Sequence, residues 1–294
     1  MARIRIVHST VYTYRNPVGL TRHRLMLRPD DSHDLRLVES SLVVEPTPSR
    51  ILWAHDVFNN SIGFLEWPED LRTDRLSIVS TLDLIHHPDG APAPLYSLDP
   101  AAEHFPFAYS ADELADLGRL VEPAGADPDG AVAAFGQRFA REHGAAGTLA
   151  LIEAMTHAIQ AEIGYSARYE EGTQTAAETL RLGTGTCRDF AVLMIGALRS
   201  LEIAARFVTG YLYDDTSGTT RGGGSTHAWC SVYLPGAGWI EYDPTNGLLA
   251  GANLVRVGAT RTAAQALPIS GGFIGDASDP LALEVDVAVS AIPL

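Results

Sequence analysis

Lysine is absent from this chain of 294 residues, and all 21 of its basic residues are arginine. The simplest origin of that bias is a GC-rich genome, because bulk composition follows genome and protein class more than mechanism. Whatever its origin, the chain carries no side-chain amine. A protein of this composition could not be cross-linked to itself through lysine by an acyl-transfer reaction.

Positive charge and long apolar runs are also scarce. The 21 arginines face 36 acidic residues, which gives a net charge of −15. An acidic surface repels phosphate, so we expect neither nucleic acid nor an anionic membrane as a partner. No long apolar run follows the strand-like segment Met1–Val7. The sequence therefore predicts no signal peptide and no membrane span.

The chain has only two cysteines, Cys187 and Cys230. Two cysteines in a chain of this length do not make a disulfide scaffold. A reactive thiol is better preserved in a reducing compartment, so we expect a cytoplasmic protein. The hydrophobic fraction of 46% is that of an ordinary globular protein, and the length suffices for two compact domains.

Cys187 lies where a helix is predicted to begin. Glycines and threonines precede it from Gly183 onward, and apolar residues recur at helical spacing from Phe190, which predicts a helix over 187–201. A thiol at a helix start lies among unpaired N–H groups and at the positive end of the helix dipole, which favour the thiolate. The position therefore suits a nucleophile better than a core thiol.

A thiolate nucleophile needs a base, and the base needs an orienting group. Residues 225–234 and 239–243 read as two strands separated by the turn 235–238, which predicts an antiparallel hairpin. His227 lies toward the far end of the first arm and Asp243 at the end of the second. The hairpin therefore brings a carboxylate within reach of an imidazole, although the sequence leaves its register open.

Four ordered blocks in this part of the chain resemble the transglutaminase-like superfamily, and more narrowly the bacterial transglutaminase-like enzymes described as candidate cysteine proteases. They cover roughly residues 160–250 and comprise Gly185–Ala191, Leu198–Tyr211, Thr226–Trp229 and Gly238–Asn246. The resemblance implies Cys187 as nucleophile, His227 as base and Asp243 as the group that orients the base. It also implies the backbone N–H of Cys187 as a donor to the oxyanion.

The predicted fold class is α+β, with a papain-like transglutaminase core after a sandwich-like β-domain. Short alternating segments and a hairpin signal at Asn59-Asn60 indicate the β-rich part, which the resembled family often carries. The predicted divisions are a β-rich domain over 1–90, a proline-rich linker over 91–110 and a catalytic domain with a C-terminal strand over 111–294. Helices are expected at 111–121, 128–143 and 147–163.

The resemblance and the triad together predict a cysteine-dependent amide hydrolase, a peptidase or amidase, that acts through a thioester on Cys187. Transglutaminase-type transfer to an amine and a non-catalytic binding module on the same fold are the alternatives. The expected substrate is a peptide or protein amide, and no cofactor is expected. Some relatives are associated with ATP-dependent peptide-ligase-like proteins, so the resemblance also implies such a partner and a small peptide conjugate as substrate.

Other residues near the predicted triad have simpler explanations. We expect Cys230 to be a buried core thiol, Asp189 to stabilise the first helical turn, and Arg188 to be solvated or paired with a carboxylate. Trp229 shares a face with His227 and either walls the site or packs in the core. The glycine-rich loop 214–225 either gates the site or is a mobile turn. The triad residues are also zinc-ligand types, but their spacing fits no metal signature.

Overall fold

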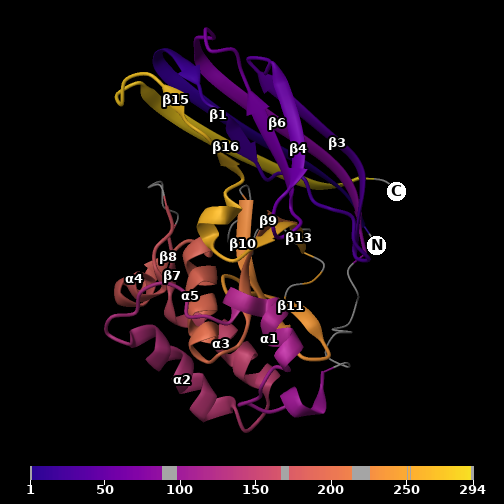
Figure 1. Ribbon diagram of the computed structural model, residues 1–294, viewed down its shortest axis with the longest axis vertical. Helices are drawn as coiled ribbons and strands as arrows, with labels where there is room; N and C mark the ends of the chain where they lie inside the picture. The colour runs from indigo at the N-terminus through magenta and orange to yellow at the C-terminus, as the bar shows by residue number, and fades with distance from the viewer. Residues whose placement is uncertain are drawn as a thin grey trace.

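The computed structural model describes residues 2–87, 98–166, 172–213, 226–249, 251 and 253–292. A β-rich region lies above a mixed region of helices and strands, and both chain ends are on the β-rich side (Figure 1). The β-rich region is formed by β1 (Ala2–Leu20), β2 (His23–Leu25), β3 (Leu35–Glu45), β4 (Arg50–His55), β5 (Ser61–Glu66), β6 (Thr73–His86), β14 (Ile269–Ser270), β15 (Phe273–Ile274) and β16 (Pro280–Ile292).

The β-rich region consists of two antiparallel sheets packed face to face. One has the order β15-β1-β6-β3, with β16 also paired to β1, and the other has the order β14-β2-β5-β4. Both sheets contribute to a hydrophobic cluster that includes Val18, Leu65 and Ile78. The predicted β-rich N-terminal region is therefore confirmed. The hairpin expected at Asn59-Asn60 joins β4 to β5, with Asn59 at a φ of 65°.

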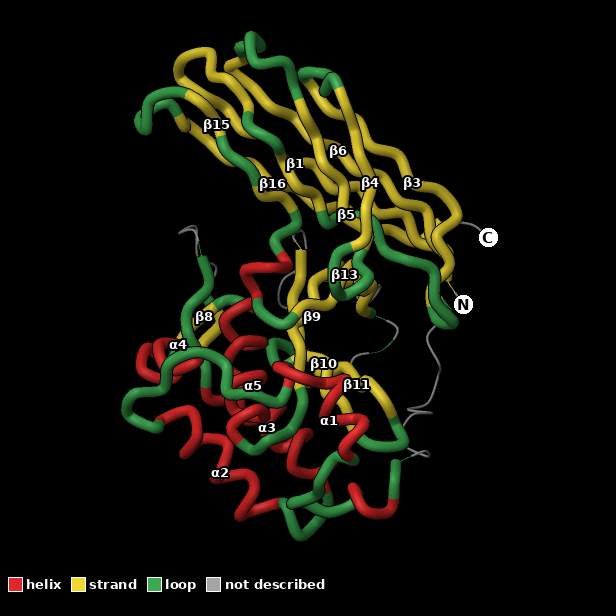
Figure 2. Tube along the Cα trace, in the orientation of Figure 1, coloured by secondary structure: helices red, strands yellow, loops and turns green. Residues whose placement is uncertain are grey.

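The mixed region builds a second antiparallel sheet system with helices against it (Figure 2). Its sheet has the order β12-β11-β10-β9-β13. Helix α5 packs on β9 and β10, and α2, α3 and α4 pack on α5. The elements are α1 (Ala111–Leu117), α2 (Ala131–His143), α3 (Thr148–Glu162), β7 (Gly164–Tyr165), α4 (Ala176–Leu182), β8 (Thr184–Gly185), α5 (Cys187–Ser200), β9 (Ala205–Leu212), β10 (Thr226–Leu234), β11 (Gly238–Asp243), β12 (Leu248–Leu249) and β13 (Leu254–Thr260).

Several elements differ from the sequence expectations. The C-terminal strand forms as β16, but it pairs with β1 of the β-rich region rather than within the segment 111–294 to which it was assigned. Alternation of side chains predicts a strand and says nothing of its partner. Helix α4 was not expected, although Thr175 and Glu178 form a capping box at its start. Residues 91–97 of the predicted linker lie outside the described residues.

Polar side chains join the two regions. The side-chain amide of Asn60 donates to the carbonyl of Ala259 over 2.9 Å and accepts from the N–H of Ala259 over 2.8 Å, so it pairs with β13 as a neighbouring strand would. His8 of β1 lies 3.0 Å from the hydroxyl of Tyr211 in β9. Both histidine and tyrosine are buried. The β-rich region is thereby docked on the sheet that carries the candidate site.

Candidate active site

Cys187 is the first residue of α5, as the sequence predicts. Asp189 caps the helix, since its Oδ2 accepts from the N–H and hydroxyl of Thr186 over 2.8 and 2.9 Å. Its Oδ1 accepts from the N–H of Gln174 over 2.7 Å. A Cβ at Gly185 would lie 2.8 Å from that of Asp189, so only glycine permits this close approach. The expected structural role of Asp189 is therefore the one it has.

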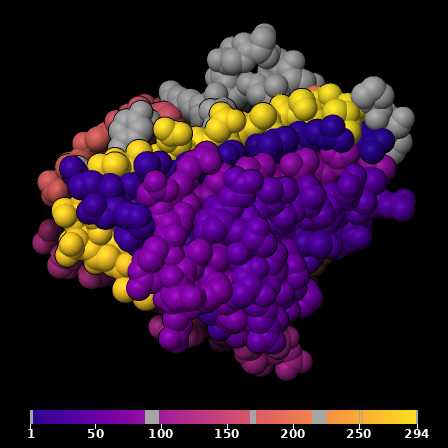
Figure 3. Space-filling model, turned by 90° about the horizontal axis from the view of Figure 1, so that it is seen from above, coloured from indigo at the N-terminus to yellow at the C-terminus, as the bar shows by residue number. Residues whose placement is uncertain are grey.

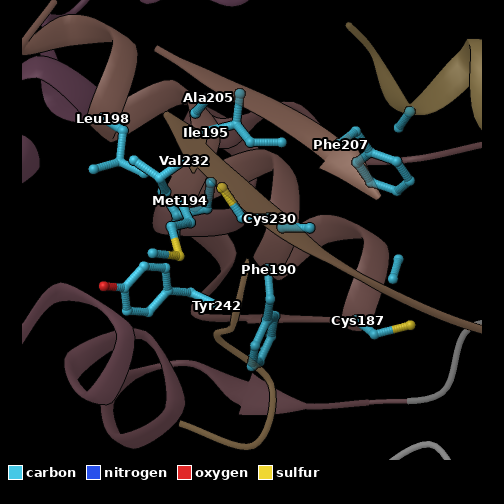
Figure 4. Close-up of a cluster of buried hydrophobic side chains, with 14 of the residues drawn as sticks. Cys187, Phe190, Met194, Ile195, Leu198, Ala205, Phe207, Cys230, Val232 and Tyr242 are labelled. Atoms are coloured by element: carbon cyan, nitrogen blue, oxygen red, sulfur yellow. The ribbon is translucent and has the colours of Figure 1, made fainter. Parts of the chain in front are cut away.

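The position of the Cys187 side chain follows from the apolar face of α5. Phe190 and Met194 on that face are fully buried against the sheet, whereas Cys187 is 7% exposed. Figure 4 shows Cys187 at the end of this cluster with its sulfur pointing away from it, and Cys230 in the middle. The thiol is therefore held by the core helix but stands at the edge of the core.

The hairpin of β10 and β11 brings the predicted base and its orienting group together. Cys230 pairs with Tyr242 and Leu234 with Gly238, which settles the register that the sequence leaves open. Nε2 of His227 lies 2.9 Å from Oδ2 of Asp243. His227 is 1% exposed and Asp243 is fully buried. The two side chains form a buried ion pair when the imidazole is protonated.

Backbone and side-chain donors hold the Asp243 carboxylate in place. Its Oδ1 accepts from the N–H groups of Thr245 and Asn246 over 2.9 and 3.3 Å, and its Oδ2 accepts from Nδ2 of Asn246 over 2.8 Å. The carbonyl of Asn246 in turn accepts from Gln160 of α3 over 2.9 Å. Asn246 lies in the last of the four blocks that resemble the superfamily, but the sequence predicts no role for it. Its position just after a strand-ending Asp-Pro pair was the available signal.

The charges of the pair shift both pKa values. Burial, the largest effect on His227, opposes its protonation, but the charge and hydrogen bond of Asp243, with a contribution from Cys187, raise its pKa to about 10. Burial likewise works against ionisation of Asp243, but the His227 charge and its hydrogen bonds lower its pKa. Nε2 of His227 contacts Asp243, and Nδ1 makes no hydrogen bond of ordinary geometry to another described residue, although Cys187 lies close enough to contribute to the raised pKa. Nδ1 is therefore the ring nitrogen that does not contact Asp243.

Trp229 lies against the imidazole of His227. Their rings stack with centroids 6.0 Å apart and an interplanar angle of 28°. Nε1 of Trp229 donates to Glu241 over 2.8 Å, and Glu241 also accepts from Arg256 over 2.7 Å. Trp229 is fully buried, so it both packs in the core and walls one side of the histidine. The sequence predicts no role for Glu241 or Arg256, because periodicity within a strand does not indicate which residues of another strand it meets.

Arg188 departs in part from its expectation. The residue is partly exposed, but it forms no ion pair with a carboxylate within the described part of the chain. Its guanidinium donates to the carbonyls of Ala263 and Ala266 over 2.6 and 3.5 Å, and lies 4.9 Å from the ring centroid of Phe207. Burial lowers the pKa of Arg188. The side chain ties the start of α5 to the segment that leads back to the β-rich region.

Two further expectations concern metals and the loop 214–225. Within the described ranges, no group of three or more His, Cys, Asp or Glu side chains could hold a metal ion. The loop 214–225, weighed as a gate, lies outside the described residues.

No helix in the described part of the chain is long and apolar enough to cross a membrane. Cys230 is fully buried, as expected.

Comparison with known families places these residues in context. Residues 137–244 match the transglutaminase-like superfamily, and residues 4–84 match the bacterial transglutaminase-like N-terminal region. The two matches together span more than half of the chain, and the first contains Cys187, His227 and Asp243. Residues 137–244 therefore form a transglutaminase-like core, and residues 4–84 form the N-terminal region of the bacterial transglutaminase-like type.

Individual relatives extend over the whole chain. Uncharacterized proteins of Mycobacterium bovis and Mycobacterium tuberculosis are each 29% identical over 305 residues, covering 99% of this chain and 93% of theirs. The crystal structure of a candidate cysteine protease from Cytophaga hutchinsonii superposes with a TM-score of 0.72 at 22% identity, covering 100% of this chain and 92% of that one. At that identity the likeness shows the fold.

Proposed function

We propose that this protein is a cysteine-dependent amide hydrolase, a peptidase or amidase, that acts through a thioester on Cys187. One observation carries the proposal. The buried His227–Asp243 pair, joined over 2.9 Å, leaves one imidazole nitrogen for a thiol at the start of a helix. A nucleophile, its base and an orienting carboxylate are the groups that acyl transfer requires.

The first half-reaction forms the thioester. The Cys187 thiolate attacks the amide carbonyl carbon, and the carbonyl oxygen becomes an oxyanion near the backbone N–H of Cys187. The His227 imidazolium then gives its proton to the amide nitrogen, the C–N bond breaks and the amine leaves. The raised pKa of His227, about 10, keeps that proton available at neutral pH.

The second half-reaction returns the enzyme to its starting state. Neutral His227 takes a proton from water, the resulting hydroxide adds to the thioester carbonyl, and the C–S bond breaks. The products are a free acid and the thiolate–imidazolium pair. Asp243 stabilises the imidazolium in both halves and fixes the ring through Nε2. A reducing cytoplasm, where we propose that the protein acts, would keep both free cysteines as thiols.

The acceptor decides between hydrolysis and transfer. A glutamine-containing peptide is incubated with the protein and a labelled alkylamine, and products and intact protein are read by mass, with Cys187→Ala as the control. We expect free acid, a transient acyl adduct on Cys187 and little amine product. Amine product in excess of free acid at millimolar amine would overturn the hydrolase in favour of a transglutaminase. The absence of both adduct and product would favour a binding module.

A further inference from the structure

Strand β16 has one partner and one free edge. It pairs antiparallel with β1 from Arg3 to Tyr14, with a register shift at Leu281, and no other described strand pairs with it. Figure 3 shows β16, in yellow, running along the rim of the β-rich region. After Pro280 the strand contains no proline, and like the whole chain it contains no lysine. Its outward N–H and C=O groups are those to which an extended chain can add.

The side chains of β16 divide by face. Leu283 and Val285 form an apolar row on one face of the strand and are 55% and 45% exposed, and Leu281, at the register shift, is 53% exposed. Glu284 and Asp286 are exposed on the other face. The edge therefore presents apolar and acidic side chains alternately. A strand with apolar and basic side chains in the same alternation would be complementary to it.

The other long edges are protected. Strand β3 carries Arg36 and Glu39 and has a register shift between Leu37 and Glu39. Strand β13 is covered by the amide of Asn60, and β4 and β12 are short. Charges, irregularities and coverage are the usual means of keeping an edge from pairing. Beyond the register shift beside Pro280, strand β16 has no further bulge or proline, and the charges of its exposed half, Glu284 and Asp286, are both acidic.

The apolar row runs up to the sheet that holds the candidate site. Val287, the next residue of the row, is buried and pairs with His8, whose ring contacts the Tyr211 hydroxyl over 3.0 Å. Tyr211 follows Gly210, the cross-strand partner of His227. An extended chain rises about 3.4 Å per residue. A segment of six residues therefore reaches roughly 20 Å.

We propose that the free edge of β16 binds an extended segment of the polypeptide substrate as an added strand, with apolar side chains alternating with basic ones. The apolar side chains cover Leu281, Leu283 and Val285, and arginine or lysine faces Glu284 and Asp286. That the bound segment belongs to a substrate rests on the proposed function, whereas the binding of an extended segment does not. A second copy of this chain is disfavoured as the occupant because each copy carries a net charge of −15.

Binding is tested on the full chain with Cys187→Ala, so that no turnover interferes. The probe is a fluorescent ten-residue peptide of alternating leucine and arginine, followed by anisotropy, and its control is the same peptide N-methylated along one edge. We expect the plain peptide to bind and the methylated one to bind at least about tenfold more weakly. Equal binding of the two peptides overturns the added strand.

Variants locate the binding edge. Leu283→Lys with Val285→Lys should weaken peptide binding about tenfold or more. Val43→Lys on the opposite edge strand β3, where Val43 is 56% exposed, is the matched control and should leave binding unchanged. Thermal melts check that each variant folds. Binding indifferent to the β16 variants overturns the assignment, and so does a concentration-dependent dimer that only those variants abolish.

Catalysis separates this proposal from the proposed function. A glutamine amide substrate is compared with and without the appended leucine–arginine segment. We expect the segment to lower KM about tenfold with kcat unchanged, and the two β16 substitutions to remove that gain. Peptide binding without any effect on KM overturns the substrate role. If no amide is hydrolysed at all, the proposed function fails while the anisotropy results still decide the fate of the edge.

Discussion

The surroundings of Cys187 and Cys230 differ although both thiols belong to the same buried cluster between α5 and the sheet. Cys230 lies in the middle of β10, fully buried, and burial raises the pKa of its thiol. Cys187 begins a helix at the edge of that cluster and adjoins the imidazole of His227. Both residues are buried cysteines. Their surroundings differ because Cys187 lies at a helix end beside a histidine, whereas Cys230 lies in the middle of a strand.

The largest expected effect is the loss of the nucleophile. Cys187→Ala should reduce amide hydrolysis by roughly 10⁴-fold or more, because in the proposed mechanism no other group forms the thioester. Cys230→Ala should leave the rate within about twofold and cost about 1 kcal/mol of unfolding free energy through the small cavity it opens. Steady-state rates and urea denaturation of both variants measure the two effects. Comparable rates in the two variants would contradict the distinction between the thiols.

The second effect concerns the rate at which each thiol is alkylated. Iodoacetamide should modify Cys187 far faster than Cys230 near neutral pH. His227→Ala should slow the modification of Cys187 by about tenfold or more, because the proposed mechanism has the His227 imidazolium stabilise the thiolate. Peptide mapping after limited labelling gives both rates from one sample. Equal labelling of the thiols, or a Cys187 rate that ignores His227, would count against the pair.

The third effect is the loss of the orienting charge. Asp243→Asn should lower the rate of hydrolysis by roughly 10²- to 10⁴-fold, less completely than Cys187→Ala. It should also lower the pKa of His227, because the neighbouring negative charge that raises it is gone. An NMR titration of the imidazole measures that pKa. Full activity in Asp243→Asn would remove Asp243 from the proposed mechanism.

The same pair makes stability depend on pH. The pKa of His227 is raised to about 10 in the folded protein, so the stability it contributes is fully present below its ordinary pKa of about 6.5 and is lost as pH rises through about 10. The pKa of Asp243 is lowered, so its contribution is lost only at acidic pH. The unfolding free-energy difference between the wild type and Asp243→Asn should therefore shrink between pH 6.5 and 10. Urea titrations across that range measure it, and a constant difference would contradict the coupling.

The sequence was sufficient where the signal was local. The helix start at Cys187 follows from glycine and threonine before an apolar 3.6-residue period, and the hairpin of 226–243 follows from β-rich runs around a glycine turn. The capping box of α4, Thr175 with Glu178, was equally local and was overlooked. The parts of the fold that rest on such short patterns could therefore be predicted from the sequence.

The sequence was insufficient where distant segments meet. Strand β16 pairs with β1 at the other end of the chain, and the sequence pattern of neither strand indicates which strand it pairs with. The 2.9 Å contact of His227 with Asp243 required the hairpin register, which only the folded sheet supplies. Asn246 and Glu241 act by hydrogen bonds to residues that they reach through turns and across strands. Such contacts follow from packing rather than from periodicity.

The smallest effect tests how far the surroundings of Cys187 extend. Glu241 accepts from Trp229 over 2.8 Å, and Trp229 stacks on His227, so Glu241 holds the wall beside the imidazole. Glu241→Gln keeps an oxygen for the indole N–H but removes the ion pair with Arg256, and should cost about 1 kcal/mol of unfolding free energy. Hydrolysis should fall only a few-fold, because the ring stays anchored through Asp243. The discriminating measurement is the pH profile of Cys187 alkylation. The control is Cys230→Ala, which changes the residue that follows Trp229. If the pH profile shifts in Glu241→Gln but not in this control, Glu241 is among the groups that position His227. An unshifted profile would confine it to stability.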